Sequence, residues 1–354
     1  MGHLIDIVAV VATILGVAQT LGFGVEQFVA GLTRIGIGGL MDAEGGATFV
    51  GIVVALVAIM GASTLSALSG VGKGIKWLSN INMVLSIVLL GFFIIFGATW
   101  FGATAFFIGI WDYLIALPSM SFNVWSSDGV DGSESFLLTQ WQGWWPVFYW
   151  AWWIAFAPFV GLFLARISRG RSIREFVLGA MIVPSLMCFV WFAWAGGTAI
   201  DLELNGGASG VIFDAANGDK IFAMTEFMLA PIAEALAWGM AMLIVVLLMT
   251  FLVTSADSAV LIVNTINAAG DEGPKARPHI LFWGAALALV VGGLLISGGT
   301  SAIQTAMVIG ALPFSIVMVL MCLSLIKAIY NDGKREAIGV PTVQSEIDGA
   351  TPAE

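Results

Sequence analysis

Charged side chains are scarce in this sequence. Only 10% of its 354 residues are Asp, Glu, Lys or Arg, whereas 59% are hydrophobic; a soluble domain carries about 25% charged residues. Too few polar side chains remain to cover a water-facing surface, which excludes an ordinary soluble enzyme and a disordered chain. The net charge of −10 excludes the basic surface that a nucleic-acid-binding protein needs.

Reactive and metal-binding side chains are also few. The two cysteines, Cys188 and Cys322, lie in apolar runs and cannot form a disulfide scaffold, and the two histidines, His3 and His279, are far apart in the sequence. The sequence has no HExxH, CxxC or phosphate-binding-loop motif, and it shows no nucleophile–base pair. We therefore predict that the protein is not an enzyme and carries no cofactor.

Long apolar runs dominate what is present. A helix needs about 20 apolar residues to span a bilayer, and eight segments approach or exceed this length: 4–32, 47–69, 80–98, 143–165, 173–196, 232–264, 280–297 and 302–328. They predict an all-α polytopic membrane protein whose transmembrane domain covers residues 1–330. Residues 331–354 are polar and acidic, and we expect them to form a disordered tail.

The basic residues indicate an orientation. If the N-terminus of this chain is cytoplasmic, Arg34 and Lys220 fall on outer segments, and all the other Lys and Arg residues fall on inner ones. Because cytoplasmic loops are enriched in Lys and Arg, we predict a multi-pass protein of the cell (inner) membrane with both ends in the cytoplasm. In the long outer connection 99–142, the aromatic stretch from Trp100 to Leu117 is expected to form an amphipathic helix on the outer surface.

The fourth span, "WWPVFYWAWWIAFAPFVGLF", has the densest aromatic signal. At about 100° per residue, Trp145, Tyr149 and Trp152 share one helical stripe, and Trp150 and Trp153 share another. Two interpretations stay open. The rings either pack against neighbouring helices and the headgroup region, or they form a cage for a quaternary ammonium ion, which cannot donate a hydrogen bond but is attracted to indole faces.

Pro158 lies near the middle of this span. It lacks the N–H that would bond to the Ile154 carbonyl and disfavours a straight helix, while Ala155, Ala157 and Gly161 leave room around it. Freed backbone groups at membrane depth are tolerated where they line a cavity, and broken helices recur in secondary transporters. We expect an interruption of the helix at Pro158, either a break at a binding site or a simple kink.

Polar groups inside the spans are few, so each is a functional hypothesis. In "FLVTSADSAV", the hydroxyls of Thr254 and Ser255 and the carbonyl of Phe251 share one helical face and offer three oxygens to a small alkali cation such as sodium. The alternative is that the hydroxyls bond to carbonyls of their own helix or join neighbouring helices. Asp257 either faces the substrate or pairs with an arginine of an inner loop; both interpretations stay open.

The segment "FYWAWWIAFAPFVGLFLARISRGRSIREFVLGAMIVPS" resembles the signature segment of the betaine/choline/carnitine transporter (BCCT) family. "FLVTSADSAV" and "LIDIVAVVATILGVAQTLGFG" resemble further segments of that family, and the resemblance covers residues 1–330. It implies the inverted five-helix repeat of sodium-coupled symporters and a homotrimer. Because family members have twelve spans, it also implies that the eight spans here form a partial fold that lacks the first four helices.

The resemblance also implies roles for the aromatic residues. Trp153 would be the tryptophan of the aromatic box that contacts the trimethylammonium group, Trp152 a neighbouring substrate contact and Trp150 a residue of the access path. Phe156 stands where the family often has another tryptophan. This difference puts the way in which the anionic end of the substrate is held in doubt.

For sodium, the resemblance implies one half-site and one weaker site. Phe251, Thr254 and Ser255 would form half of the first site, with the other half on a helix outside this chain. Thr13 and Phe159 resemble parts of a second site, which is weakened because Val17 replaces its second threonine.

These observations predict a secondary transporter that imports a quaternary-ammonium compatible solute by sodium symport and so protects against osmotic stress. Glycine betaine is the first candidate substrate, ahead of choline, carnitine and similar onium solutes. The partners expected are this solute, sodium as the coupling ion and the lipid bilayer, with no nucleic acid. Two alternatives stay open: a sodium-independent substrate/product exchanger of the same family, and a membrane sensor or subunit that does not transport.

Overall fold

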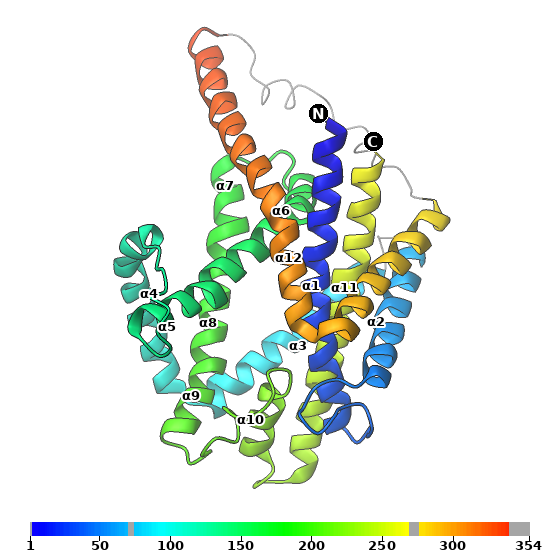
Figure 1. Ribbon diagram of the computed structural model, residues 1–354, viewed down its shortest axis with the longest axis vertical. Helices are drawn as coiled ribbons and strands as arrows, with labels where there is room; N and C mark the ends of the chain where they lie inside the picture. Colours follow the sequence, from blue (N-terminus) through cyan, green and yellow to red (C-terminus); the bar gives the residue numbers. More distant parts are fainter. Residues whose placement is uncertain (1, 70–73, 269–275, 340–354) are drawn as a thin grey trace.

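The computed structural model describes residues 2–69, 74–268 and 276–339, and within them the chain is helical and forms no strand. The helices in chain order are α1 (Gly2–Arg34), α2 (Phe49–Ser69), α3 (Gly74–Phe96), α4 (Thr99–Phe122), α5 (Glu134–Gln142), α6 (Phe148–Ile167), α7 (Ile173–Val177), α8 (Val183–Trp191), α9 (Gly197–Leu204), α10 (Lys220–Leu229), α11 (Glu234–Asn267) and α12 (Arg277–Ala337). Three π-helical turns, η1 (Gly143–Val147), η2 (Leu178–Ile182) and η3 (Phe192–Gly196), join α5 to α6, α7 to α8 and α8 to α9. Figure 1 shows the arrangement.

Eight helical stretches of the described chain are long and apolar enough to cross a membrane. This finding confirms the predicted class, an all-α polytopic membrane protein. One of the eight is α4, which was expected to lie on the outer surface rather than to count as a span. It has the lowest mean hydropathy of the eight, 1.5, and it packs at the side of the molecule against α3, α9 and η3 (Figure 1). Its helical character is confirmed, and its position on the outer surface stays a prediction.

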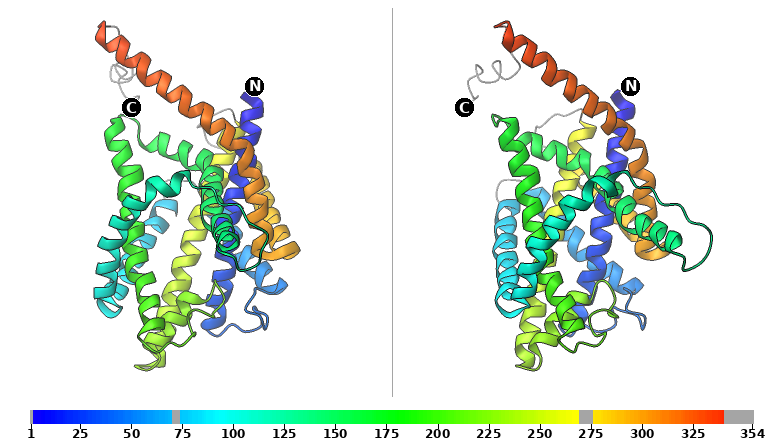
Figure 2. Two further views of the ribbon diagram at one scale, coloured as in Figure 1. Left: turned by 60° about the vertical axis from the view of Figure 1, so that its left-hand side comes forward. Right: turned by 90° about the vertical axis from the view of Figure 1, so that its left-hand side faces the viewer.

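The last two predicted spans, 280–297 and 302–328, are the two arms of α12. The backbone leaves the helical conformation only at Gly298 and Gly299, and Gly299 has φ 63° and ψ −156°, a region that is open to glycine and strained for other residues. The arms therefore meet at a sharp bend, which is seen from three directions in Figures 1 and 2.

The second arm is longer than predicted. It continues through Ala337, so the first residues of the predicted tail extend the helix; that a separate disordered tail follows the transmembrane domain stays a prediction. Residues 340–354, the greater part of the predicted tail, lie outside the described residues.

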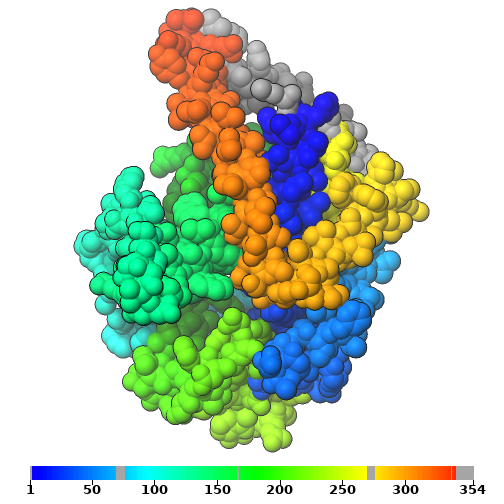
Figure 3. Space-filling model, viewed as in Figure 1, coloured from blue at the N-terminus to red at the C-terminus, as the bar shows by residue number. Residues whose placement is uncertain are grey.

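Helix α1 forms the centre of the bundle. It packs against α2, α6, α11 and α12, and Figure 3 shows its first half exposed between α11 and the second arm of α12. Glycines allow this close packing: a Cβ atom at Gly24 would lie 2.1 Å from Leu252 of α11, and one at Gly22 would lie 2.4 Å from Ile303 of α12. Without side chains at these positions the helix backbones approach closely, as is common within membranes.

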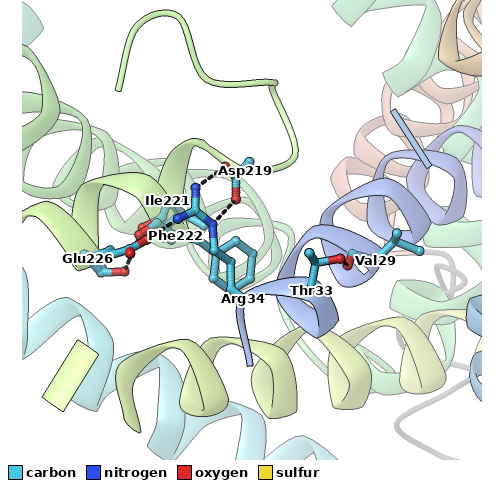
Figure 4. A network of polar contacts seen from close by, with 8 residues as sticks. Val29, Thr33, Arg34, Asp219, Ile221, Phe222 and Glu226 are labelled. Carbon is cyan, nitrogen blue, oxygen red and sulfur yellow. Dashed lines mark hydrogen bonds and ion pairs between the residues drawn. The ribbon is translucent and has the colours of Figure 1, made fainter. Parts of the chain in front are cut away.

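The far end of α1 is held by ion pairs. The guanidinium of Arg34 bonds to Asp219, with 2.9 Å between Nε and Oδ1, and also pairs with Glu226 of α10 (Figure 4). These contacts tie α1 to the segment that connects α9 with α11.

Basic clusters lie at one end of the molecule. In Figure 1 the start of α1, the loop between α6 and α7 and the end of α12 lie together at the top, with Arg169, Arg171 and Lys334 in the last two segments. The end of α1, which carries Arg34, and α10, which begins at Lys220, lie toward the opposite end. The segregation matches the predicted sidedness of the loops; that the basic end faces the cytoplasm stays a prediction.

Candidate functional site

The aromatic helix α6 follows a π-helical turn. The turn Gly143–Val147 contains Pro146, and α6 then runs from Phe148 to Ile167. The predicted break at Pro158 is not seen, because α6 continues through this residue as one helix; the alternative, a simple kink, stays a prediction. A proline inside a helix removes a single backbone hydrogen bond, and here its ring is accommodated without ending the helix. The irregular backbone lies instead at the N-terminal end of α6, in η1.

Trp152 is packed among other aromatic rings. The Trp152 ring lies 5.7 Å from the ring of Phe23 on α1, 5.6 Å from Phe148 and 6.0 Å from Tyr149, and Tyr149 stacks on Trp145 at 5.8 Å. Aromatic pairs at these distances and tilts are favourable. Trp152 therefore joins α6 to α1, whereas Trp145 and Tyr149 of the same stripe are 55% and 43% exposed. A substrate contact at Trp152 stays a prediction.

The other stripe of α6 is open. Trp150 and Trp153 are 69% and 66% exposed, and one helical turn separates them, so the two indoles lie on the same side of α6. Within the described chain this face of α6 is therefore exposed. A face of this kind can receive a cation or another apolar surface, and the structure brings Trp150 and Trp153 together while it separates them from Trp152.

Phe156 lies on the side of α6 that faces α1. Its ring meets the Phe159 ring edge-on at 5.6 Å, and a Cβ atom at Gly16 of α1 would lie 3.0 Å from its Cδ2 atom. The absence of a side chain at Gly16 gives this ring its space.

The predicted sodium ligands lie on α11. Phe251 is 45% exposed, and Thr254 and Ser255 are half-buried. The Thr254 hydroxyl lies 3.0 Å from the carbonyl oxygens of Thr250 and Phe251, which is the local bonding that the alternative interpretation foresaw. Because a hydroxyl has one hydrogen and two lone pairs, this bonding leaves the Thr254 oxygen able to accept a hydrogen bond or to coordinate a cation.

Two residues that sequence reasoning missed lie beside this face. The amide nitrogen of Asn82 on α3 lies 3.4 Å from Thr254 Oγ1, and the Ser66 hydroxyl on α2 donates to Asp257 Oδ2 at 2.7 Å. The sequence signal for Asn82 was its position inside an apolar span, where an amide needs a partner.

Asp257 is fully buried. Besides Ser66, the hydroxyl of Ser258 bonds to its Oδ1 atom at 3.3 Å. Within the described residues Asp257 forms no ion pair, so the predicted pairing with an inner-loop arginine is not seen there. The side chains that bond to its carboxyl in the described chain are the hydroxyl groups of Ser66 on α2 and Ser258 on α11.

The second predicted sodium site has one buried oxygen. Thr13 is fully buried, and its hydroxyl has no hydrogen-bond partner in the described chain. It faces a small cavity whose other lining residues are Ile14, Val17, Ala259, Val260, Val263, Trp283 and Leu287. All of these have apolar side chains apart from the indole N–H of Trp283, and Phe159 is not among them. The structure therefore does not bring Thr13 and Phe159 together around this cavity.

Comparison with known proteins identifies the family. The family model described as "BCCT, betaine/carnitine/choline family transporter" matches residues 1–334. The chain belongs to the BCCT family. This finding confirms the resemblance, and it means that the family to which the chain belongs is one of transporters rather than enzymes.

Curated BCCT relatives agree over most of the chain. It is 38% identical to a glycine betaine/proline/choline transporter of Vibrio parahaemolyticus, over 94% of this chain and 56% of the relative. It is 37% identical to the glycine betaine transporter OpuD of Bacillus subtilis (94% and 60%) and 35% identical to an ectoine/hydroxyectoine transporter of Virgibacillus pantothenticus (94% and 62%). The chain therefore spans somewhat more than half the length of these relatives.

Proposed function

We propose that this BCCT protein imports a quaternary-ammonium compatible solute, glycine betaine first, together with sodium. One observation carries the proposal: Trp150 and Trp153 present two indoles on the same side of a membrane helix. A cation that cannot form hydrogen bonds gains about 0.5–2 kcal/mol over such a face. Two of the relatives, which are named as transporters of glycine betaine, support this class of substrate.

The support for sodium coupling comes from oxygen atoms on α11, not from the aromatic rings of α6. The Phe251 carbonyl and the Thr254 and Ser255 hydroxyls share one face of α11 by their spacing, and the buried Asp257 follows Thr254 about one turn further along the helix. Hard oxygen ligands suit small, hard cations. Binding of sodium to one conformation in preference to another would couple its gradient to movement of the solute, and no covalent step is needed.

The membrane arrangement belongs to the same proposal. We place the basic end, with the start of α1 and the end of α12, in the cytoplasm of a cell whose inner membrane holds the protein. The segregation of the basic residues to one end supports this orientation. We further propose a homotrimer, an osmoprotective role and no cofactor besides the coupling ion.

Uptake into liposomes tests the proposal. The full-length gene product is reconstituted, and uptake of labelled glycine betaine is measured with an inward sodium gradient, with an equal potassium gradient and with sodium at equal concentration on both sides. We expect accumulation only with the sodium gradient. Rapid counterflow whose rate does not depend on sodium would instead identify an exchanger. Betaine binding without any uptake would identify a sensor or subunit.

A further inference from the structure

The side chain of Asn82 is an unusual group for its surroundings. It lies on α3 in the apolar sequence "INMVLSIVLL", it is only 4% exposed, and α3 packs against α11 at this level. Its amide nitrogen reaches Thr254, while its amide oxygen has no hydrogen-bond partner within the described chain. A buried polar atom without a partner costs about 1–3 kcal/mol, so the position calls for a functional reason.

The distance between Asn82 and Thr254 favours a shared ion over a strong hydrogen bond. Their N···O separation of 3.4 Å is long beside the usual value of about 2.9–3.0 Å for N–H···O bonds. Two oxygens that each lie about 2.4 Å from one ion, at right angles to each other, are about 3.4 Å apart, and 2.4 Å is a typical oxygen distance for a cation of the size of Ca²⁺, which sodium resembles. The two ends of an amide exchange places by a half-turn of the side chain.

The Thr254 oxygen can accept either partner. Its hydrogen is directed to the carbonyls of Thr250 and Phe251, both at 3.0 Å, which leaves its lone pairs for the N–H of Asn82 or for a cation. These two partners compete, because an amide N–H and a cation seek the same lone pairs. After the half-turn, the amide oxygen would lie where the N–H now lies.

The charge next to this position favours a cation. Asp257 lies one turn further along α11 than Thr254, fully buried, with its carboxyl oxygens fixed by Ser66 and Ser258. A negative charge one helical turn away in a medium of low dielectric constant attracts a monovalent cation strongly.

We propose that Asn82 is a further ligand of the coupling cation: its amide oxygen joins the Thr254 and Ser255 hydroxyls when the ion binds, and its N–H holds Thr254 when the ion leaves. The proposal rests on the proposed sodium symport and adds a third helix, α3, to the site. It makes the α3–α11 contact depend on whether the ion is bound.

Substitutions at Asn82 test this role in the full-length protein reconstituted into liposomes. Asn82→Leu removes the oxygen and keeps a side chain that branches at Cγ, whereas Asn82→Asp keeps an oxygen. The matched control is Asn80→Leu, which changes the same residue type at an exposed position of the same helix. Two quantities are measured: equilibrium binding of radioactive sodium, and the sodium concentration that gives half-maximal betaine uptake.

We expect Asn82→Leu to raise the sodium dissociation constant and the sodium concentration for half-maximal uptake at least tenfold. Both values should stay within about threefold of wild type in Asn82→Asp and should be unchanged in Asn80→Leu. The betaine KM at saturating sodium should stay near the wild-type value in all three variants. If Asn82→Leu does not reach the membrane, Asn82→Ala takes its place with the same expected rise.

The possible failures are distinguishable. Wild-type uptake and binding that are indifferent to sodium would overturn the symport itself. Wild-type sodium dependence with an unchanged sodium constant in Asn82→Leu or Asn82→Ala would overturn only the role of Asn82. An equal loss in the Leu and Asp variants would assign Asn82 to helix packing and reject it as a ligand.

Discussion

The open face of α6 and the polar face of α11 are built in opposite ways. On α6, Trp150 and Trp153 project outward and bond to nothing in the described chain, whereas on α11 Asp257 is fully buried and Thr254 bonds to its own helix and to α3. An indole face is largely apolar and can be exposed within a membrane at little cost, whereas hydroxyl and carboxyl groups there must find partners. An aromatic face for an onium ion can therefore stay exposed before its ligand binds, whereas the polar groups of an ion site need partners on neighbouring helices.

The largest effect is expected at α11. Thr254→Ala combined with Ser255→Ala removes two of the proposed sodium oxygens, so sodium stimulation of betaine uptake should disappear. The measurement is uptake in liposomes as a function of sodium concentration. Thr305→Ala is the control, because this hydroxyl bonds to its own helix on another element, at 3.0 Å from the Ser301 carbonyl. A normal sodium curve in the double variant would show that α11 does not hold the ion.

At α6, Trp153→Ala should raise the betaine KM at least tenfold. Tenfold corresponds to about 1.4 kcal/mol, which lies within the range for a cation over an aromatic face. The control is Trp144→Ala, an indole that is 60% exposed near the start of the same segment. Equal KM values for the wild type and the Trp153 variant would leave the open face without a role in binding the solute.

The glycines of α1 allow the two regions to be disturbed separately. A Cβ atom at Gly16 would lie 3.1 Å from the Ala155 backbone of α6, and one at Gly24 would lie 2.1 Å from Leu252 of α11. Overpacking of this kind costs about 1–3 kcal/mol. Gly16→Val should therefore raise the betaine KM several-fold. Gly24→Val should raise the sodium concentration for half-maximal uptake several-fold.

Gly61→Val on α2 serves as the control for this pair, because a Cβ atom there would meet no atom within 4 Å. If both α1 variants changed the betaine KM, or the sodium concentration for half-maximal uptake, by the same factor, α6 and α11 would not act as separate binding regions.

Phe156→Trp should have a smaller effect that concerns specificity. The added indole N–H can donate to the anionic end of a substrate, so the ratio of uptake of betaine to uptake of choline should rise a few-fold. Because Phe156 lies against Gly16, thermal stability is measured alongside. A ratio identical to that of the wild type, in a protein of normal stability, would show that this position does not recognise the anionic end.

The smallest effect is expected away from both regions. Arg34→Gln removes the ion pairs with Asp219 and Glu226 (Figure 4), and exposed pairs contribute about 0–1 kcal/mol. The melting temperature should fall slightly in dilute buffer, and the difference should shrink in about 1 M salt, where charges are screened. Changed betaine or sodium constants in this variant would show that the far end of α1 communicates with the binding regions.

Much of the fold could be predicted because one physical requirement dominates it. Backbone groups in a bilayer must bond internally, so long apolar runs become helices, and α1, α2, α11 and the first arm of α12 follow the predicted runs closely. The predicted and observed helices differ in segments where hydropathy gives little indication of where a helix ends. Residues 331–337 extend a helix although they are polar, and Pro158 lies inside an intact α6 because a single missing N–H does not oblige a helix to end.

The chain's composition and periodicity by themselves determined a helical membrane protein with an aromatic α6 and a polar face on α11, because these properties depend on the order of side chains along one helix. Only the tertiary structure decided that Trp152 is packed while Trp153 is open, and that Asn82 and Ser66 reach Thr254 and Asp257. Contacts between helices depend on how each helix is rotated and how closely it approaches its neighbours. That geometry is set jointly by packing across all the helices of the bundle, and no single segment encodes it.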